Sequence, residues 1–152
     1  MSTMTRRAVL AVSLAASVGF SASAMAEDTI KVGVLVTLQG AFTVLGEDSM
    51  RGAKLALQEH NMTAGGKKIE IVTGSSDASP DSAANAARKL VEQDKVDILV
   101  GPLSGDEGLA VKNYAKTQPQ VTFINGTSAA QDTTLRDPAP NFFRFTTDGA
   151  QW

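Results

Sequence analysis

Apolar residues are concentrated in five short runs, which we predict to be the strands of a sheet. Residues 30–37 (IKVGVLVT) are rich in β-branched residues and almost continuously apolar, which is typical of a strand buried on both faces. Residues 68–73 (KIEIVT) alternate instead, so that Ile69 and Ile71 share one face. The other predicted strands are 96–100 (VDILV), 121–124 (VTFI) and the short run 141–146 (NFFRFT).

Between the first four runs, apolar residues recur at the spacing of an amphipathic helix. The first of these segments spans 47–61, the second follows residue 79, and the third starts near residue 106. The predicted buried stripes are Met50, Ala53, Ala56 and Leu57 in the first helix, Ala83, Ala86, Ala87, Leu90 and Val91 in the second, and Ala110, Val111, Tyr114 and Ala115 in the third.

Two of these helices carry start signals. Ser79 can cap the second helix, Pro80 is preorganised for its first position, and Asp81 suits the positive end of the helix dipole. Asp106 and Glu107 are expected as acids in the first turn of the third helix. The order β-α-β-α-β-α-β with short links predicts an α/β fold, a doubly wound parallel sheet with right-handed crossovers and helices on both faces.

The first residues read as an export signal and not as part of the fold. Arg6 and Arg7 precede an uncharged, mainly apolar run at 8–20, and a small-x-small pattern ends at Ala26. We therefore predict a signal peptide over residues 1–26, cleaved after Ala26. A membrane anchor is disfavoured because the segment is rich in Ala and Ser and its strongly apolar part is short. The paired arginines leave both the twin-arginine route and the general secretory route open.

Cleavage would leave residues 27–152 and would remove two arginines and no acid, so the net charge would change from −2 to −4. A chain without cysteine is compatible with export to a bacterial periplasm. The absence of cysteine also excludes a disulfide framework and thiolate chemistry, and the single histidine, His60, excludes a multi-histidine metal site. The acidic balance argues against nucleic-acid binding.

We expect no enzymatic activity, catalytic residue, metal or cofactor. The chain has no GxGxxG after the first strand, no GxxxxGK[ST] and no GxSxG. Small solutes bind doubly wound sheets beyond the carboxyl ends of the strands. The loops expected there are 38–46, 101–106 and 125–128. The candidate ligand-binding groups are the backbone of Gly40, Gly46, Gly101, Gly105 and Gly126 and the hydroxyls of Ser104, Thr127 and Ser128.

The order and spacing of several segments carry a family resemblance. Four segments carry it, in this order: DTIKVGVLVTLQGAFTVLGEDSMRGAKLALQEHN, KKIEIVTGSSDASPDSAANAARKLV, VDILVGPLSGDEG and VTFINGTSAAQDTTLRDPAPNFFRFTTDGAQ. It resembles the type I periplasmic solute-binding proteins of ABC transporters, of the leucine/isoleucine/valine-binding family. The resemblance covers essentially all of residues 27–152.

This resemblance implies an exported receptor that delivers a small-molecule ligand to the permease and ATPase subunits of an ABC importer. The family fold has two α/β lobes that close on the ligand, and residues 27–152 would form an incomplete N-terminal lobe. The chain stops where the crossing to the second lobe would begin. We therefore expect this piece alone to bind ligand weakly or not at all. A reading frame that continues beyond Trp152 would mean that the sequence is truncated, whereas a stop codon would mean a degenerate or unusual gene.

The resemblance also assigns roles to individual residues. Gly126 would offer its carbonyl to a ligand ammonium, and Ser128 would offer its hydroxyl and amide to a carboxylate. Gly105 stands where the family has a serine, and Leu45 stands where it often has an aromatic residue, for which Phe42 could compensate. These two departures leave the ligand open among amino acids, amides and aromatic acids. The expected ligand-binding residues are Phe42, Leu45, Ser104, Gly105, Asp106, Gly126, Thr127 and Ser128.

An alternative function for the same fold is a periplasmic domain that senses a ligand and signals to a partner protein. Neighbouring genes would discriminate between the two, because permease and ATPase genes favour transport and a histidine kinase gene favours sensing.

Overall fold

The computed structural model describes residues 29–151. The predicted export signal over 1–26 lies outside the described residues. Within the described part of the chain, no helix is long and apolar enough to cross a membrane. The elements are β1 (Thr29–Thr37), the 3₁₀ helix η1 (Gly40–Phe42), α1 (Thr43–Glu59), β2 (Thr63–Ala64), β3 (Lys67–Ser76), α2 (Pro80–Arg88), the π-helical turn η2 (Lys89–Gln93), β4 (Ile98–Val100), α3 (Gly105–Ala115), β5 (Thr122–Asn125), the 3₁₀ helix η3 (Gln131–Thr133) and β6 (Phe142–Arg144).

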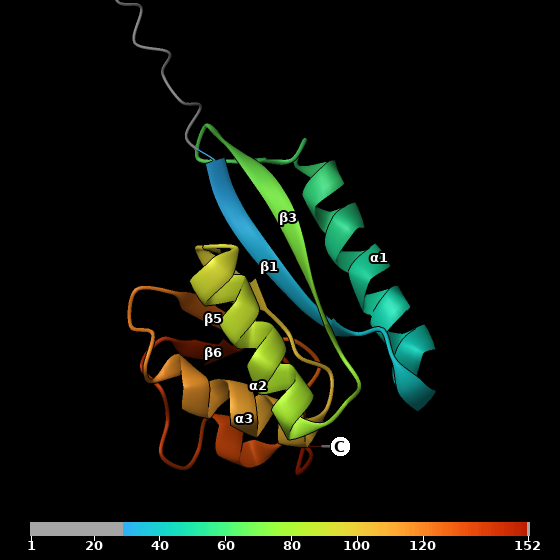
Figure 1. The fold of residues 1–152 in the computed structure, drawn as a ribbon, viewed down its shortest axis with the longest axis vertical. Helices are drawn as coiled ribbons and strands as arrows, with labels where there is room; N and C mark the ends of the chain where they lie inside the picture. Colours follow the sequence, from blue (N-terminus) through green and yellow to red (C-terminus); the bar gives the residue numbers. More distant parts are fainter. Residues whose placement is uncertain (1–28, 152) are drawn as a thin grey trace, which may run out of the picture.

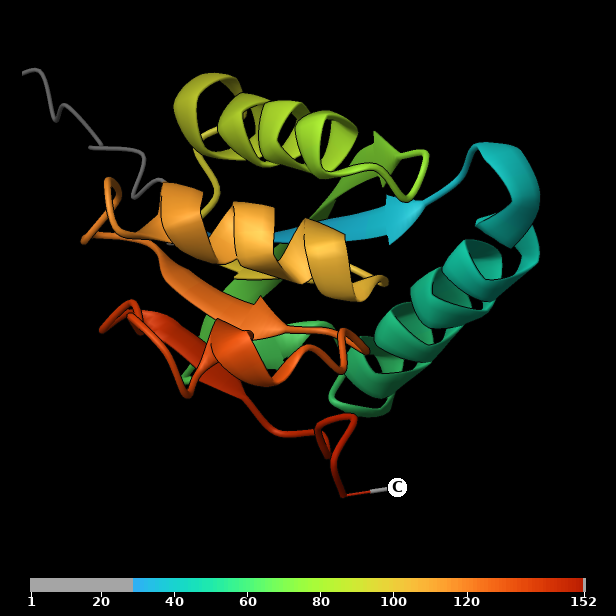
Figure 2. The same cartoon turned by 90° about the horizontal axis from the view of Figure 1, so that it is seen from below.

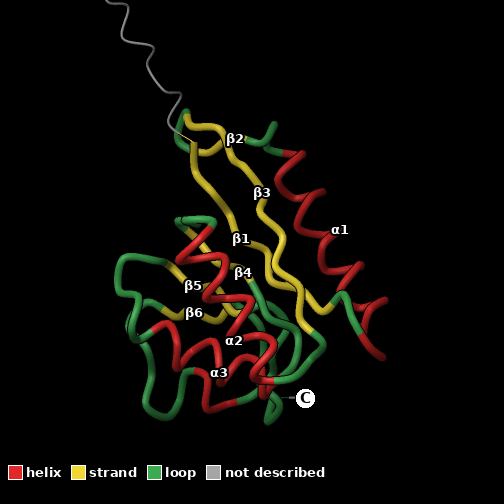
Figure 3. Tube along the Cα trace, viewed as in Figure 1, coloured by secondary structure: helices red, strands yellow, loops and turns green. Residues whose placement is uncertain are grey.

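The sheet has the strand order β2-β3-β1-β4-β5-β6 (Figures 1 and 3). All neighbouring pairs from β3 to β6 are parallel, and in the centre Val34 of β1 is aligned with Thr73 of β3 and with Val100 of β4. The predicted doubly wound parallel sheet is confirmed. The short strand β2, which pairs antiparallel with the start of β3, was not predicted, because two exposed residues carry no hydrophobic pattern.

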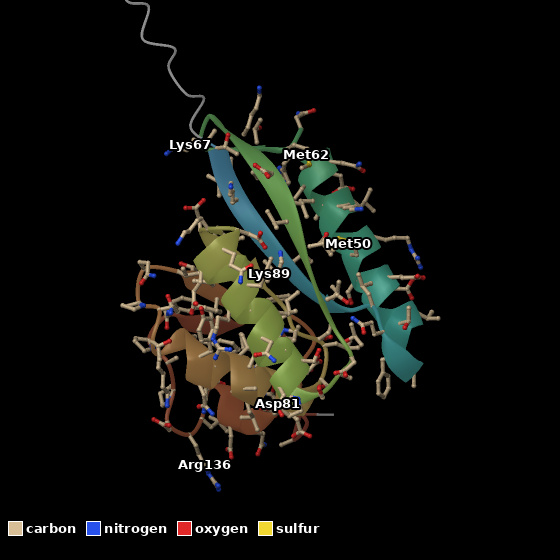
Figure 4. All side chains as sticks on the ribbon, viewed as in Figure 1. Met50, Met62, Lys67, Asp81, Lys89 and Arg136 are labelled. Atoms are coloured by element: carbon tan, nitrogen blue, oxygen red, sulfur yellow. The ribbon has the colours of Figure 1, made fainter. Side chains whose placement is uncertain are left out.

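Helices cover both faces of the sheet, as predicted: α1 lies on one face, and α2 and α3 lie side by side on the other (Figure 2). The alternation of β1 explains this arrangement. Val34 and its neighbours two residues away pack with Met50 of α1, which Figure 4 shows beside the strands. Leu35 points to the opposite face and packs with Leu90 and Phe123, which are fully buried. The continuously apolar strand therefore supplies both cores.

The second predicted helix begins as its sequence signals indicate. The Ser79 Oγ accepts a hydrogen bond of 3.3 Å from the Ser82 N–H, and Pro80 is the first residue of α2. The helix continues into η2, which brings Leu90 and Val91 into the core. The buried stripe predicted for this helix is confirmed.

The first predicted helix is confirmed in place but not in every detail. α1 begins at Thr43 and not at residue 47. Met50 is buried, and Ala53 and Leu57 are half-buried, but Ala56 is exposed. The prediction that Ala56 widens the buried stripe is wrong, because α1 contacts the sheet along a narrower line than its apolar pattern suggests.

Candidate functional site

The carboxyl ends of the parallel strands bring the predicted loops to one edge of the sheet. β1 pairs with β4, and β4 pairs with β5, so the loops that follow these three strands are neighbours. From β1 the chain first builds β3 on one side and then β4 on the other, which makes the gap between β1 and β4 the topological switch point. Open α/β sheets bind their ligands at this position.

A hollow with a volume of about 320 Å³ lies at this switch point, between α1, β1 and the loops after β4 and β5. Its walls are mainly apolar. Gly126 and Thr127, two of the predicted ligand-binding residues, line it. The lining residues are Val34, Leu35, Val36, Ser49, Gly52, Ala53, Val100, Gly101, Pro102, Leu103, Gly126, Thr127 and Phe145.

Backbone contacts hold the loops after β4 and β5 together. The Thr127 N–H donates to the Pro102 carbonyl over 3.3 Å, and the Thr127 hydroxyl reaches the Leu103 carbonyl at 3.4 Å. A Cβ at Gly126 would lie 2.6 Å from the Pro102 carbonyl oxygen, so only glycine permits this approach. Asn125 is buried and closes its own loop by donating from Nδ2 to the Ser128 carbonyl at 2.7 Å.

The first turn of α3 carries three more of the predicted residues. Ser104 caps the helix, and its Oγ accepts a hydrogen bond of 3.4 Å from the Glu107 N–H. Gly105 is half-buried, and a Cβ there would lie 3.3 Å from the Ala130 Cβ. Asp106 is exposed. The amides of Gly105 and Asp106 have no acceptor within the helix, so they are available to a ligand.

Six of the eight predicted residues do not line the hollow: the three at the start of α3, and Phe42, Leu45 and Ser128. Phe42 and Leu45 stand at the start of α1 and are each 49% exposed, but neither lines the hollow. Ser128 is fully buried beneath its loop, and a Cβ added at Gly108 of α3 would overlap its Oγ. That hydroxyl has no hydrogen-bond partner within residues 29–151. The loop of Ser128 thus reaches the edge, whereas its side chain lies against α3.

Glu107 belongs to this edge although we expected it only as a first-turn acid. It is fully buried, and its carboxylate accepts from the Ser104 N–H at 2.8 Å and from the Ser76 hydroxyl at 2.5 Å. Ser104 and Glu107 form a capping box, whose S-x-x-E pattern is visible in the sequence. The contact with Ser76 joins residues 31 positions apart and has no sequence signal.

The loop after β3 adds a carboxylate to the same edge. Asp77 accepts hydrogen bonds from the Ser79 hydroxyl at 2.6 Å and from the Ser79 N–H at 2.9 Å. The hydroxyl of Ser79 first, and then its N–H, hold the pKa of the Asp77 carboxyl below its usual value. Within the described residues, no group of three His, Asp or Glu side chains could hold a metal ion. The edge therefore offers backbone groups, hydroxyls and a carboxylate beside an apolar hollow.

Comparison with known proteins identifies the family. A family model described as periplasmic binding protein matches residues 29–152. This chain belongs to the periplasmic binding protein family. It is 32% identical over 130 residues to an amino acid binding protein of Pseudomonas aeruginosa, an alignment that covers 77% of this chain and 34% of that protein. It is 31% identical over 110 residues to Leu/Ile/Val-binding protein homolog 7 of Brucella suis, covering 71% of this chain and 27% of that protein.

Solved structures of the family agree with the observed lobe. A solute binding protein of an ABC transporter from Rhodopseudomonas palustris, in complex with 3,4-dihydroxybenzoic acid, matches with a TM-score of 0.74 and 32% identity, over 82% of this chain and 34% of that one. The substrate binding protein LivJ of Streptococcus pneumoniae, in complex with isoleucine, matches with a TM-score of 0.70 and 29% identity, over 80% and 34%. The chain spans about a third of the length of these relatives. The predicted type I, leucine/isoleucine/valine-binding class is confirmed.

Proposed function

We propose that this chain is part of the substrate-binding component of an ABC importer. In the periplasm it would capture a small polar or carboxylate solute, which is an amino acid, an amide or an aromatic acid, and present it to the permease and ATPase subunits. It would act by binding alone, without catalysis. The observation that carries the proposal is the convergence of the loops after β1, β4 and β5 on one sheet edge, beside an apolar hollow.

The chemistry of this edge supports a ligand with a polar head and an apolar body. Backbone N–H groups of Gly105 and Asp106 and the hydroxyl of Thr127 can bond a carboxylate or an amide. The Gly126 carbonyl can accept from an ammonium or an amide N–H. The apolar walls of the hollow can receive a hydrocarbon side chain or a ring. The loops would hold the head while the hollow excludes water from the body.

The ligands of the relatives support the same range. Solved relatives contain isoleucine and 3,4-dihydroxybenzoic acid, and a third, from Rhodopseudomonas palustris and 28% identical with a TM-score of 0.75, contains benzoate. All three ligands combine a carboxylate with an apolar body. This shared chemistry is the substrate class that we propose for the protein to which this chain contributes.

The proposal includes export to the periplasm. We propose that residues 1–26 are removed after Ala26 and that residues 27–152 form part of the N-terminal lobe. Mass spectrometry of the N-terminal peptide from a periplasmic extract tests this directly. A mature N-terminus at Glu27 is expected, whereas a chain that keeps Arg6 and Arg7 would refute cleavage.

Ligand binding is tested by thermal denaturation of the protein produced from the uninterrupted reading frame. The panel contains L-isoleucine, a short aliphatic amide, benzoate and 3,4-dihydroxybenzoate. A ligand at a hundredfold excess over its Kd stabilises the folded protein by ~2.7 kcal/mol, which raises Tm. If no compound of the panel raises Tm, the proposed function is wrong.

A matched pair of variants locates the site. Thr127→Val removes the hydroxyl at the hollow, and Thr73→Val makes the same change at an exposed position within β3, away from the strand ends. Loss of one hydrogen bond, at about 0.5–1.5 kcal/mol, should weaken binding roughly two- to tenfold in the first variant. The second variant should bind normally. Equal effects in both would place the ligand elsewhere.

A further inference from the structure

Glu107 is a buried carboxylate without a cation. Its side chain is 0% exposed, and within residues 29–151 it has no ion-pair partner. Its two oxygens accept from the Ser104 N–H at 2.8 Å and from the Ser76 hydroxyl at 2.5 Å. Burial of a carboxylate is costly unless hydrogen bonds replace its water. An acid at this helix position could cap α3 equally well while exposed, so capping alone does not explain the burial.

The hydrogen bonds around Glu107 form a chain with one direction. The single proton of the Ser76 hydroxyl is donated to Glu107, so the Thr37 hydroxyl, 3.3 Å away, donates to the Ser76 oxygen. Thr37 and Ser76 are both fully buried. A separate hydrogen bond, from the Ser104 hydroxyl to the Ala78 carbonyl at 3.3 Å, ties Ser104 to the loop after β3. The Ser76 hydroxyl and the Ser104 N–H both donate to the carboxylate, whose two oxygens are the acceptors on which these hydrogen bonds end.

This chain of hydrogen bonds connects the elements that form the ligand edge. Thr37 is the last residue of β1, Ser76 is the last residue of β3, and Ala78 lies in the loop after β3. Ser104 is the cap of α3, and its amide is the last before those of Gly105 and Asp106. These elements are distant in the sequence and meet at Glu107. Removing the carboxylate would take the acceptor from the buried Ser76 hydroxyl and the half-buried Ser104 N–H, and would release the start of α3 from the strand ends.

We propose that Glu107 is a positioning residue for ligand binding. It fixes the Ser104 backbone relative to β1 and β3, and so holds the free amides of Gly105 and Asp106 where the ligand head binds. The predicted effect on affinity rests on the proposed function, because the position of these amides matters to binding only if the edge receives a ligand. Glu107 itself does not touch the ligand.

The first test measures positioning without any ligand. Amide hydrogen exchange, read by mass spectrometry of peptides that cover residues 101–108, is compared between the unmodified protein and Glu107→Ala. Exchange in this segment should become at least about tenfold faster, because the loss of hydrogen bonds to a charged group changes a local equilibrium by that order. Exchange of peptides from α1 should stay the same. Unchanged exchange at 101–108 would refute the proposal.

The second test measures affinity for L-isoleucine and 3,4-dihydroxybenzoate by calorimetric titration. Glu107→Ala should weaken binding at least about tenfold. Glu107→Gln should restore affinity to within about threefold, because the Gln carbonyl can accept from the Ser104 N–H and its amide can donate to Ser76 once that hydroxyl reverses. Ser76→Ala, which removes one of the two donors, should give an intermediate loss and remains informative if Glu107→Ala does not fold.

The matched control is Val111→Ala on the same helix, a fully buried position in the core on the α2 and α3 side. It should lower Tm but leave affinity within about twofold, because it leaves the strand ends untouched. Equal losses of affinity in Val111→Ala and Glu107→Ala would show that Glu107 only stabilises the fold, and would refute the proposal. Normal affinity in Glu107→Ala would also refute the proposal. If the unmodified protein binds neither L-isoleucine nor 3,4-dihydroxybenzoate, the proposed function is wrong for these two ligands. Hydrogen exchange still decides whether Glu107 positions the loop.

Discussion

Gly46 lies near the start of α1, where the helix packs against the last residue of β1. A Cβ at this position would overlap the Thr37 carbonyl oxygen and would lie 2.5 Å from the Thr37 carbonyl carbon. Ordinary van der Waals contact begins at 3.4 Å, and the oxygen is the nearer atom, so helix and strand would have to separate by about 1.6 Å. The obstacle is backbone, which cannot rotate away as a side chain can. Gly46→Ala should therefore destabilise the protein.

The same helix offers a control with the opposite sign. Gly52 is exposed, and a Cβ there would meet nothing within 4 Å. Replacing glycine by alanine within a helix stabilises by ~1 kcal/mol. Overpacking against a fixed backbone costs ~3 kcal/mol, so the net effect of Gly46→Ala is a loss of ~2 kcal/mol. The two alanine variants should differ by ~3 kcal/mol in the free energy of unfolding.

Urea denaturation, followed by circular dichroism, measures this difference. In both variants the dependence of the unfolding free energy on urea (the m value) should equal that of the unmodified protein, so that a change of midpoint reports a change in stability. Gly52→Ala should unfold at higher urea than the unmodified protein, and Gly46→Ala at lower urea. If Gly46→Ala is as stable as Gly52→Ala, the close approach of α1 to the end of β1 is not present in the folded protein and the reasoning is refuted.

Two further predictions concern the core on the α2 and α3 side. Phe123→Ala removes a fully buried ring that meets Tyr114 edge-to-face at 6.2 Å, and should cost ~3–5 kcal/mol in urea denaturation, whereas Phe143→Ala, at a side chain 54% exposed, should change stability by less than ~0.5 kcal/mol. Similar losses in both variants would contradict the assigned core. Burial, and then the hydrogen bond to Glu92, raise the pKa of Tyr114 to about 12 from 10.0. The fold keeps the neutral phenol, so this contribution to stability is present below pH 10 and is lost as pH rises towards 12. Because Tyr114 is the single tyrosine, a titration of tyrosine absorbance reports this residue alone. Glu92→Gln should lower the midpoint of the titration. A midpoint near 10 in the unmodified protein would show that the pKa of Tyr114 is not raised.

Local signals account for the elements that were predicted correctly. The continuous apolar run 30–37 predicted a strand buried on both faces, and β1 is such a strand because α1 covers one side and α2 with α3 the other. The start of α2 followed from Ser79 and Pro80, since capping involves only neighbouring residues. The predicted strand 96–100 is shortened to Ile98–Val100, because the Val96 N–H bonds to the carbonyl of Leu90 in η2.

The candidate site was predictable as a set of loops but not as a set of side chains. Parallel strands place their carboxyl ends at one edge, so alternation of strands and helices is enough to bring the loops after β1, β4 and β5 together. Which way each side chain points depends on packing between distant segments. Ser128 is buried against α3, Phe42 and Leu45 stand outside the hollow, and Glu107 is buried because Ser76 lies opposite it.

By itself, the sequence determined the fold class, most of the strands and helices, the edge at which a ligand would bind and the resemblance to a family, because periodicity, caps and the order of elements can be read along the chain. Tertiary structure alone decided the strand order, the switch point between β1 and β4, the apolar hollow beside it and the chain of hydrogen bonds that ends on Glu107. These features arise where residues far apart in the chain share one small volume. Their hydrogen bonds and close contacts are satisfied only when every element is in place.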